Sequence, residues 1–232
     1  MLLVVTAVDA ERDAVVRDLG PCDHITINGM PAVSVDTPAG TLHAISSGVG
    51  PVAAATTTAF ALATARYEFV ASAGIAGGFR DRIAVGEIAV AAEVTFADLG
   101  VRTDDGFLTP RDMGLPQESS YAVAGEAVVA RLLGGSTVVT HGAILTLACM
   151  TGTKTDAEQL AARFPRAIAE AMEGFGVVDA AIRAPNSPSH VTEIRAISNL
   201  IGQRDRSAWD LPAAFEALSA AFATLVKEPF DD

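Results

Sequence analysis

Four polar residues stand at the ends of apolar or helical stretches, and together they could do acid–base chemistry on a polar ligand. Glu11 follows the first apolar run, Glu173 precedes a helical stretch, and Arg195 and Asn199 lie in and after the last apolar run. Singly, each has a structural explanation, because acids suit the first turn of a helix and Asn is a common cap. In an open α/β sheet, however, ligands bind outside the carboxyl ends of the strands. Two carboxylates, an arginine and an amide at one sheet edge therefore predict a site there.

A glycine motif offers a different chemistry. Residues 48–53 (GVGPVA) satisfy the G-x-G-x-x-G/A pattern of dinucleotide-binding domains, and Glu68 lies at the distance of the acid that binds the ribose. The pattern is short, however, and it follows an antiparallel meander instead of the first strand of a βαβ unit. Small residues also allow a tight turn and bring a helix close to a sheet. We therefore expect a structural turn here, and no lysine pattern indicates ATP use.

The elements that must position these residues alternate between short β-branched runs and Ala-rich helical stretches. This alternation predicts βαβ units and a mainly parallel sheet with helices on both faces, in a single α/β domain over residues 1–232. The run 69–73 should end at the glycine cluster 74–78, and 87–96 should leave the sheet centre. Expected strands are 2–8, 69–73, 87–96, 137–147 and 191–198, with a meander at 24–28, 32–36 and 41–46. Expected helices are 10–19, 52–65, 121–133, 155–163, 173–182 and 211–225, and 98–120 is expected as a surface loop.

Composition excludes several classes of function. Hydrophobic residues make up 50% and charged residues 19% of the chain, unlike an intrinsically disordered protein. The net charge of −12 and the lack of a basic patch interleaved with aromatic residues argue against a nucleic-acid partner. Two distant cysteines without a Cys/His cluster indicate neither a zinc site nor a disulfide framework. With no signal peptide and no apolar run of about 20 residues, we expect a cytoplasmic protein with no membrane partner.

Six segments resemble the nucleoside phosphorylase and nucleosidase superfamily, along nearly the whole chain. They are 7–11 (AVDAE), 47–54 (SGVGPVAA), 73–78 (AGIAGG), 164–169 (FPRAIA), 172–173 (ME) and 195–198 (RAIS), of which the last two are the most specific. The resemblance implies a single domain with a mixed central sheet, a small-molecule nucleoside as substrate, cleavage of its N-glycosidic bond, and no metal or organic cofactor. It also supports the structural explanation of the glycine motif.

Within the superfamily the chain is similar to the futalosine hydrolase family of menaquinone biosynthesis. Asn199 and the segment 203–212 (QRDRSAWDLP) carry this similarity, because the adenine-releasing methylthioadenosine nucleosidases have Asp at the former position and lack the latter segment. An amide N–H can bind a 6-oxo group that an ionised carboxylate would repel. Asn199 therefore points to hypoxanthine as the leaving base.

The resemblance also implies roles for the individual residues. Glu11 would be the general base on water with Arg195 nearby to orient it, and Glu173 would accept hydrogen bonds from the two ribose hydroxyls. In the relatives a small hydroxyl residue helps to hold that water, whereas this chain has Ile75. Met172 would pack beneath the ribose, although an ordinary core methionine explains it equally simply.

The base and the 5′ group of the substrate have further expected neighbours. Trp209 would line the pocket for the 5′ substituent, and Arg204 or Arg206 could pair with the carboxylate that futalosine carries there. A solvated loop is the alternative explanation for both arginines. By the same resemblance the backbone around Met150 and Thr151 would face the base, and Gly77 is expected to bind the substrate.

Three other functions remain open at this stage. Phosphorolysis would need an anion site, for which Arg80 and Arg82 near the glycine cluster are candidates, although Glu11 argues against it. A methylthioadenosine/S-adenosylhomocysteine-type nucleosidase is a second possibility. A catalytically silent nucleoside-binding protein is a third, and the presence of Glu11, Glu173 and Arg195 together argues against it. Relatives are usually homodimers in which region 98–120 reaches a neighbouring site, so a homodimer or higher homo-oligomer is expected.

Overall fold

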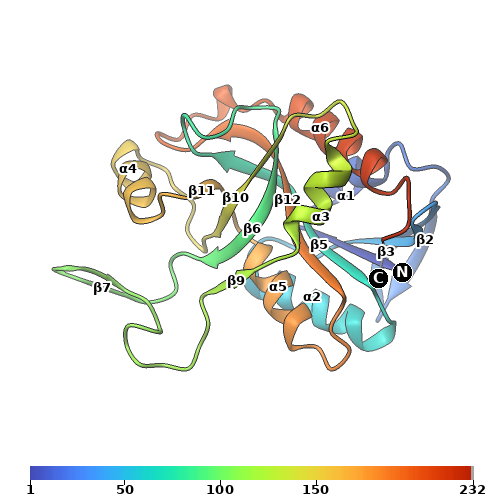
Figure 1. Cartoon of the computed structure of the whole chain (residues 1–232), viewed down its shortest axis with the longest axis horizontal. Coiled ribbons are helices and arrows are strands. Elements are labelled where there is room, and N and C mark those ends of the chain that lie inside the picture. Colours follow the sequence, from blue (N-terminus) through green and yellow to red (C-terminus); the bar gives the residue numbers. More distant parts are fainter. Residues whose placement is uncertain (231–232) are drawn as a thin grey trace.

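A large mixed β-sheet forms the centre of the computed structural model, which describes residues 1–230 (Figure 1). Within these residues ten strands join in the order β11-β10-β6-β12-β5-β1-β4-β3-β2, with β9 paired to β6. The strands are β1 (Leu2–Thr6), β2 (Asp23–Ile27), β3 (Met30–Thr37), β4 (Gly40–Ser46), β5 (Phe69–Gly78), β6 (Ile88–Phe96), β9 (Ser120–Ala122), β10 (Val139–Thr146), β11 (Ala167–Ala171) and β12 (His190–Leu200). The predicted α/β class with a mixed central sheet is confirmed.

Both strand orientations occur near the middle of the sheet. β1 is parallel to β4 and β5, and β12 is parallel to β5, so their carboxyl ends meet at one edge. β12 is antiparallel to β6, and β11 is antiparallel to β5 over a short stretch. The predicted antiparallel meander is confirmed as β2, β3 and β4.

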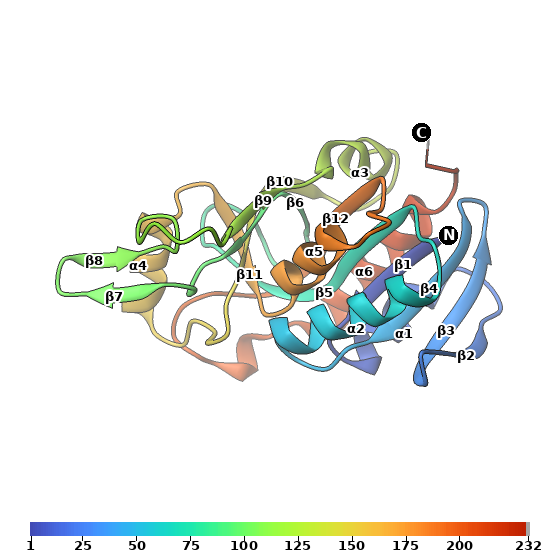
Figure 2. The same ribbon diagram turned by 90° about the horizontal axis from the view of Figure 1, so that it is seen from below.

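Helices cover both faces of the sheet, as predicted. The helices are α1 (Asp9–Val16), α2 (Pro51–Thr64), α3 (Gly125–Leu132), α4 (Lys154–Arg163), α5 (Gly174–Arg183) and α6 (Leu211–Leu225). Apolar residues of α1, α3 and α6 share one core cluster, and those of α2 and α5 share another. α2 and α5 lie side by side (Figure 2). A Cβ at Gly176 of α5 would collide with the backbone of Pro51, so this glycine allows the two helices to approach each other closely.

Three expectations about elements are wrong, and one strand was missed. β5 continues through the glycine cluster to Gly78 because β12 and β11 pair with it on both sides as far as that residue. β6 stays inside the sheet, between β10 and β12. The expected helix 121–133 is divided into β9 and α3. β11 was not expected, because four of its five residues are alanine or glutamate, which favour strands weakly.

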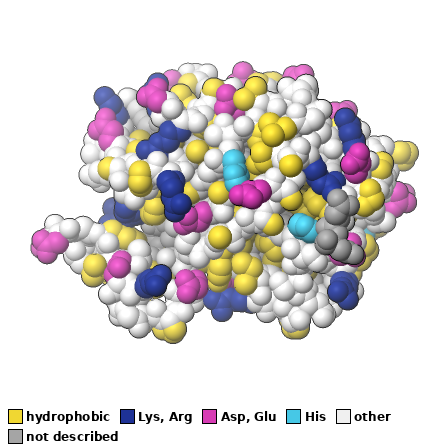
Figure 3. All heavy atoms as spheres, in the orientation of Figure 1, with side chains coloured by type: hydrophobic (Ala, Val, Ile, Leu, Met, Phe, Trp, Pro, Cys, Tyr) yellow, Lys and Arg dark blue, Asp and Glu magenta, His cyan; other side chains and the backbone are white. Residues whose placement is uncertain are grey.

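The expected loop 98–120 contains a two-stranded hairpin, β7 (Val101–Thr103) and β8 (Gly106–Leu108), which extends away from the body of the molecule (Figure 1). On the face shown in Figure 3, acidic and basic side chains are interspersed. In the part of the chain that the structure describes, no helix combines the length and the apolar character needed to cross a membrane.

Candidate active site

A cavity of about 370 Å³ opens at the sheet edge where β1, β5, β11 and β12 end. Its walls come from the start of α1, the end of β5, the β11–α5 connection, and the segment after β12. The predicted site residues that line it are Glu11, Ile75, Gly77, Met150, Thr151, Met172, Glu173, Asn199, Arg204 and Trp209. Arg195 and Arg206 do not line it.

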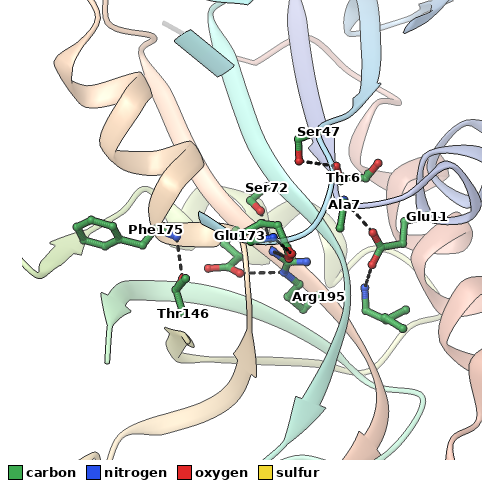
Figure 4. A network of polar contacts seen from close by, with 12 residues as sticks. Thr6, Ala7, Glu11, Ser47, Ser72, Thr146, Glu173, Phe175 and Arg195 are labelled. Atoms are coloured by element: carbon green, nitrogen blue, oxygen red, sulfur yellow. Dashed lines mark hydrogen bonds and ion pairs between the residues drawn. The ribbon is translucent and has the colours of Figure 1, made fainter. Parts of the chain in front are cut away.

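Glu11 is a buried carboxylate fixed by the backbone on two sides (Figure 4). As the third residue of α1, it reaches back so that Oε2 accepts from the N–H groups of Ala7 (2.9 Å) and Val8 (3.2 Å), while Oε1 accepts from Ile75 N–H (2.9 Å). Burial raises the pKa of Glu11 from 4.5, although Arg195 and the backbone donors oppose this shift. A carboxylate with a raised pKa beside a cavity is suited to accept a proton.

Glu173 lies opposite, just before α5, and is 5% exposed. Its Oε1 accepts from the N–H of Gly50 at 3.0 Å, and its Oε2 lies 3.4 Å from an amino group of Arg195. Gly50 precedes Pro51, the first residue of α2, and has a φ of +99°, which favours glycine. The glycine motif therefore turns the chain so that one of its backbone N–H groups holds Glu173.

Arg195 lies beneath the cavity and is 1% exposed. Its Nε donates to Glu193 (2.8 Å) and one amino group donates to Ser72 Oγ (2.8 Å). A Cβ at Gly74 of β5 would collide with both Glu11 and Arg195, so this glycine lets the two side chains approach each other. Burial lowers the pKa of Arg195, but its three neighbouring glutamates outweigh that effect and raise it. Arg195 therefore acts on Glu11 and Glu173 as a fixed positive charge from below.

Another group of polar residues faces the opposite part of the cavity. Asn199 on β12 and Glu170 on β11 both line it, on either side of Gly77 in β5. Glu170 Oε1 accepts from Thr151 N–H at 3.0 Å, and its Oε2 accepts from Thr151 Oγ1 at 2.6 Å. Burial raises the pKa of Glu170, and the bonds from Thr151 oppose this. The carboxylate thus fixes Thr151, which the family resemblance places beside the base.

The outer end of the cavity carries the predicted neighbours of the 5′ group. The guanidinium carbon of Arg204 lies 5.7 Å from the centre of the Trp209 ring, and both residues line the cavity. Arg206 lies in an exposed 3₁₀ turn, Arg206–Ala208. The structure therefore separates two arginines that the sequence treats as equivalent.

Sequence reasoning missed three polar residues of this region: Glu170, Glu193 and Ser72. Glu193 is fully buried and pairs with Arg195, and burial raises its pKa. Glu170 and Glu193 could have been found because each is an acid inside an apolar segment, AIAEA and VTEIR respectively. A buried acid is rare unless it is paired, so such a residue indicates a partner or a function. Ser72 has no comparable signal.

Metal chemistry has no evident site in this region. Across residues 1–230, no three His, Cys, Asp or Glu side chains are grouped so that they could hold a metal ion. The two cysteines, Cys22 and Cys149, are both exposed free thiols.

Comparison with known proteins places this geometry in a family. Residues 2–229 match the model of the phosphorylase superfamily. Two curated proteins named futalosine hydrolase are similar over most of their length. The one from Streptomyces coelicolor is 42% identical over 97% of this chain and 94% of its own, and the one from Acidothermus cellulolyticus is 40% identical over 96% and 89%.

The structure of a 5′-methylthioadenosine/S-adenosylhomocysteine nucleosidase from Neisseria meningitidis, in complex with methylthio-immucillin-A, superposes with a TM-score of 0.83. It is 21% identical and covers 97% of this chain and 98% of its own, so it supports the fold alone. The two futalosine hydrolases, at 42% and 40% identity, identify the family as well as the fold. The chain belongs to the phosphorylase superfamily and, within it, to the futalosine hydrolase family.

Proposed function

We propose that this protein hydrolyses the N-glycosidic bond of futalosine and releases hypoxanthine, a step of menaquinone biosynthesis. The observation that carries the proposal is one cavity in which two buried glutamates, Glu11 and Glu173, stand near an amide, Asn199. The full-length similarity to two futalosine hydrolases supports the substrate. Glycosyl hydrolysis needs a group that activates water and a site that stabilises a positively charged sugar, and these residues supply both.

Glu11 supplies the base in this proposal. Three backbone N–H groups hold its carboxylate in one orientation, so little reorganisation is needed when water binds. Its raised pKa makes it a better proton acceptor than an exposed glutamate. The proton of the attacking water moves to Glu11, the water oxygen bonds to the anomeric carbon, and the bond to the base breaks. Electrons of that bond leave with the purine.

Glu173 supplies the ribose contact. Two ribose hydroxyls donating to its carboxylate would become better donors as positive charge develops on the sugar, so the contact stabilises the transition state more than the ground state. Arg195 also pairs with Glu173, but at 3.4 Å, which is longer than its 2.8 Å bond to Glu193. Because Glu193 holds the guanidinium closely, Glu173 keeps acceptor capacity for the ribose.

The part of the cavity expected to hold the 5′ group of the substrate also supports futalosine. Arg204 lies over Trp209 at the rim of the cavity, where an aromatic carboxylate could stack on the ring and pair with the guanidinium. Of the two candidate arginines, the structure therefore favours Arg204. Arg206 does not line the cavity.

Phosphorolysis is less well supported. Arg82 is bound to the backbone carbonyls of Ala161, Phe164 and Ala167, which leaves its guanidinium committed to structure. Neither Arg82 nor the exposed Arg80 lines the cavity.

A purine-release assay with and without phosphate tests the proposal. Futalosine should yield hypoxanthine at the same rate in both buffers. Dependence on phosphate would establish a phosphorylase, release of adenine from methylthioadenosine at a higher kcat/KM would establish the other nucleosidase class, and binding without release would establish a silent binding protein.

We also propose a homo-oligomer. The β7–β8 hairpin projects away from the body of the molecule (Figure 1), where it is available to a second copy of the chain. Sedimentation at several concentrations tests this, and a monomer at all of them would reject it.

A further inference from the structure

Glu170 is a buried carboxylate of the cavity wall that the hydrolysis above does not use. Glu170 is only 1% exposed. In the sheet, Glu170 of β11 pairs with Gly77 of β5, and Asn199 of β12 pairs with the same glycine from the other side. The three residues therefore stand next to one another in neighbouring strands, with the glycine in the middle.

The glycine brings the two polar side chains toward a common point. The position that a Cβ of Gly77 would occupy lies 3.5 Å from Cγ of Glu170 and 3.6 Å from Nδ2 of Asn199. Both side chains are thus in van der Waals range of the space above Gly77, and both line the cavity. An acceptor group and an amide face each other across the floor of the pocket.

Thr151 fixes the orientation of Glu170 without exhausting it. The backbone N–H and the hydroxyl of Thr151 each donate to a different carboxylate oxygen. A carboxylate has about four lone-pair positions, so further donors can still be accepted. Asn199 is held similarly, because Nδ2 donates to Leu200 O and Oδ1 accepts from Ser198 Oγ, and Nδ2 carries a second N–H.

The edge of a 6-oxopurine has the complementary pattern. Its N1–H is a donor and the neighbouring oxo group is an acceptor, whereas a 6-aminopurine has an acceptor at N1 and a donor beside it. We propose that Glu170 is a specificity-determining residue that accepts the N1–H of a 6-oxopurine while Asn199 donates to the oxo group. This inference rests on the proposed function and deepens it, because it assigns recognition of the base to a pair of residues.

The same pair excludes the amino base. A 6-aminopurine would set the lone pair of its N1 against the carboxylate of Glu170, in a pocket where that carboxylate has little water. A mismatched polar contact in such a site weakens binding by roughly tenfold to a hundredfold. Recognition therefore includes a repulsive element as well as an attractive one.

The substitution Glu170→Gln separates recognition from support of Thr151. The amide oxygen can accept from Thr151 N–H and the amide nitrogen can donate to Thr151 Oγ1, so the segment stays in place while the acceptor toward the base becomes a donor. We expect the ratio of kcat/KM for the 6-oxo over the 6-amino nucleoside, both with the same 5′ group, to fall at least about tenfold. Thr151→Val is the matched control: it removes one support of Glu170, so it should lower both values by a similar factor.

Two binding measurements make the result independent of turnover. Calorimetry with free hypoxanthine and adenine should show the same change of preference in Glu170→Gln. Wild-type protein should bind 1-methylhypoxanthine at least about tenfold more weakly than hypoxanthine, because the methyl group replaces the donated hydrogen; this arm needs no variant to fold. Equal losses for both bases in Glu170→Gln, or equal affinity for the methylated base, would overturn the proposal. If these preferences appear but no purine is released, hydrolysis is rejected and the recognition pair stands.

Discussion

Replacing Glu193 with leucine tests whether burial, and not distance, decides what an ion pair contributes to stability in this protein. The Nε–Oε1 distance between Arg195 and Glu193 is 2.8 Å, with side chains 1% and 0% exposed. A second pair, Arg166 with Glu93, has nearly the same distance, 2.9 Å, but its side chains are 82% and 29% exposed. The two pairs therefore differ in their surroundings far more than in their geometry.

The expected costs differ by several-fold. Removing one partner of a buried pair costs about 3–5 kcal/mol, because it leaves a buried charge uncompensated. Arg195 would still have Glu173 and Ser72, so we expect the lower end, about 3 kcal/mol. For a chain of this size about 1 kcal/mol shifts Tm by roughly 2–4 °C, which gives about 6–12 °C for Glu193→Leu.

The assay is thermal unfolding of both variants at neutral pH, with Arg166→Ala as the control. An exposed pair contributes about 0–1 kcal/mol, so Tm of the control should stay within about 4 °C of wild type. A Glu193→Leu protein that melts with the wild type would refute the reasoning. It would mean that the Arg195–Glu193 pair, although buried, makes no net contribution to the free energy of unfolding.

The remaining predictions concern turnover. Burial raises the pKa of Glu11 above 4.5, and only the ionised form accepts a proton, so kcat/KM should fall as pH falls through that raised pKa. The substitution Glu11→Gln should lower kcat by about 10²–10⁴-fold while hypoxanthine still binds. Glu173→Gln should retain the fold but raise the barrier by about 3 kcal/mol, and near wild-type kinetics would remove its ribose role. Asn199→Asp should shift the kcat/KM ratio toward the amino nucleoside. Arg204→Ala should raise KM at least about tenfold for a substrate with a 5′ carboxylate and little for one without it, whereas Arg206→Ala should change neither.

The architecture was largely accessible from the sequence because its main signals are local. β-branched runs and alanine-rich stretches each predict one type of element, and α6 begins and ends where expected, at residues 211 and 225. β11 was not recognised because three of its five residues are alanine, which favours helix over strand in isolation. Its strand conformation comes from β10 and β5, which pair with it from distant parts of the sequence.

The candidate site shows the same limit. Glu11 and Asn199 could be predicted to share one edge, because β1 and β12 are both parallel to β5 and their carboxyl ends meet there. Glu173 was predicted only as a residue at the start of a helix, because the strand before it, β11, was not recognised. The burial of Arg195 could not be predicted, since it depends on Glu193 two residues away on the same strand and on Gly74 of its neighbour. The separation of Arg204 from Arg206 likewise depends on how the chain turns after β12, which no local periodicity describes.

The glycines of β5 restrict the routes by which this pocket can diverge. A side chain at Gly74 would displace Glu11 and Arg195, and one at Gly77 would meet Ile201 at 2.7 Å, so substitutions at these two glycines would disturb the neighbouring side chains. The segment after β12 is different: it contains only a short 3₁₀ turn, and it carries Arg204 and Trp209. Relatives of this chain that act on substrates with other 5′ groups should therefore differ from it mainly between residues 203 and 209. A combinatorial library aimed at new substrates should vary the same seven positions.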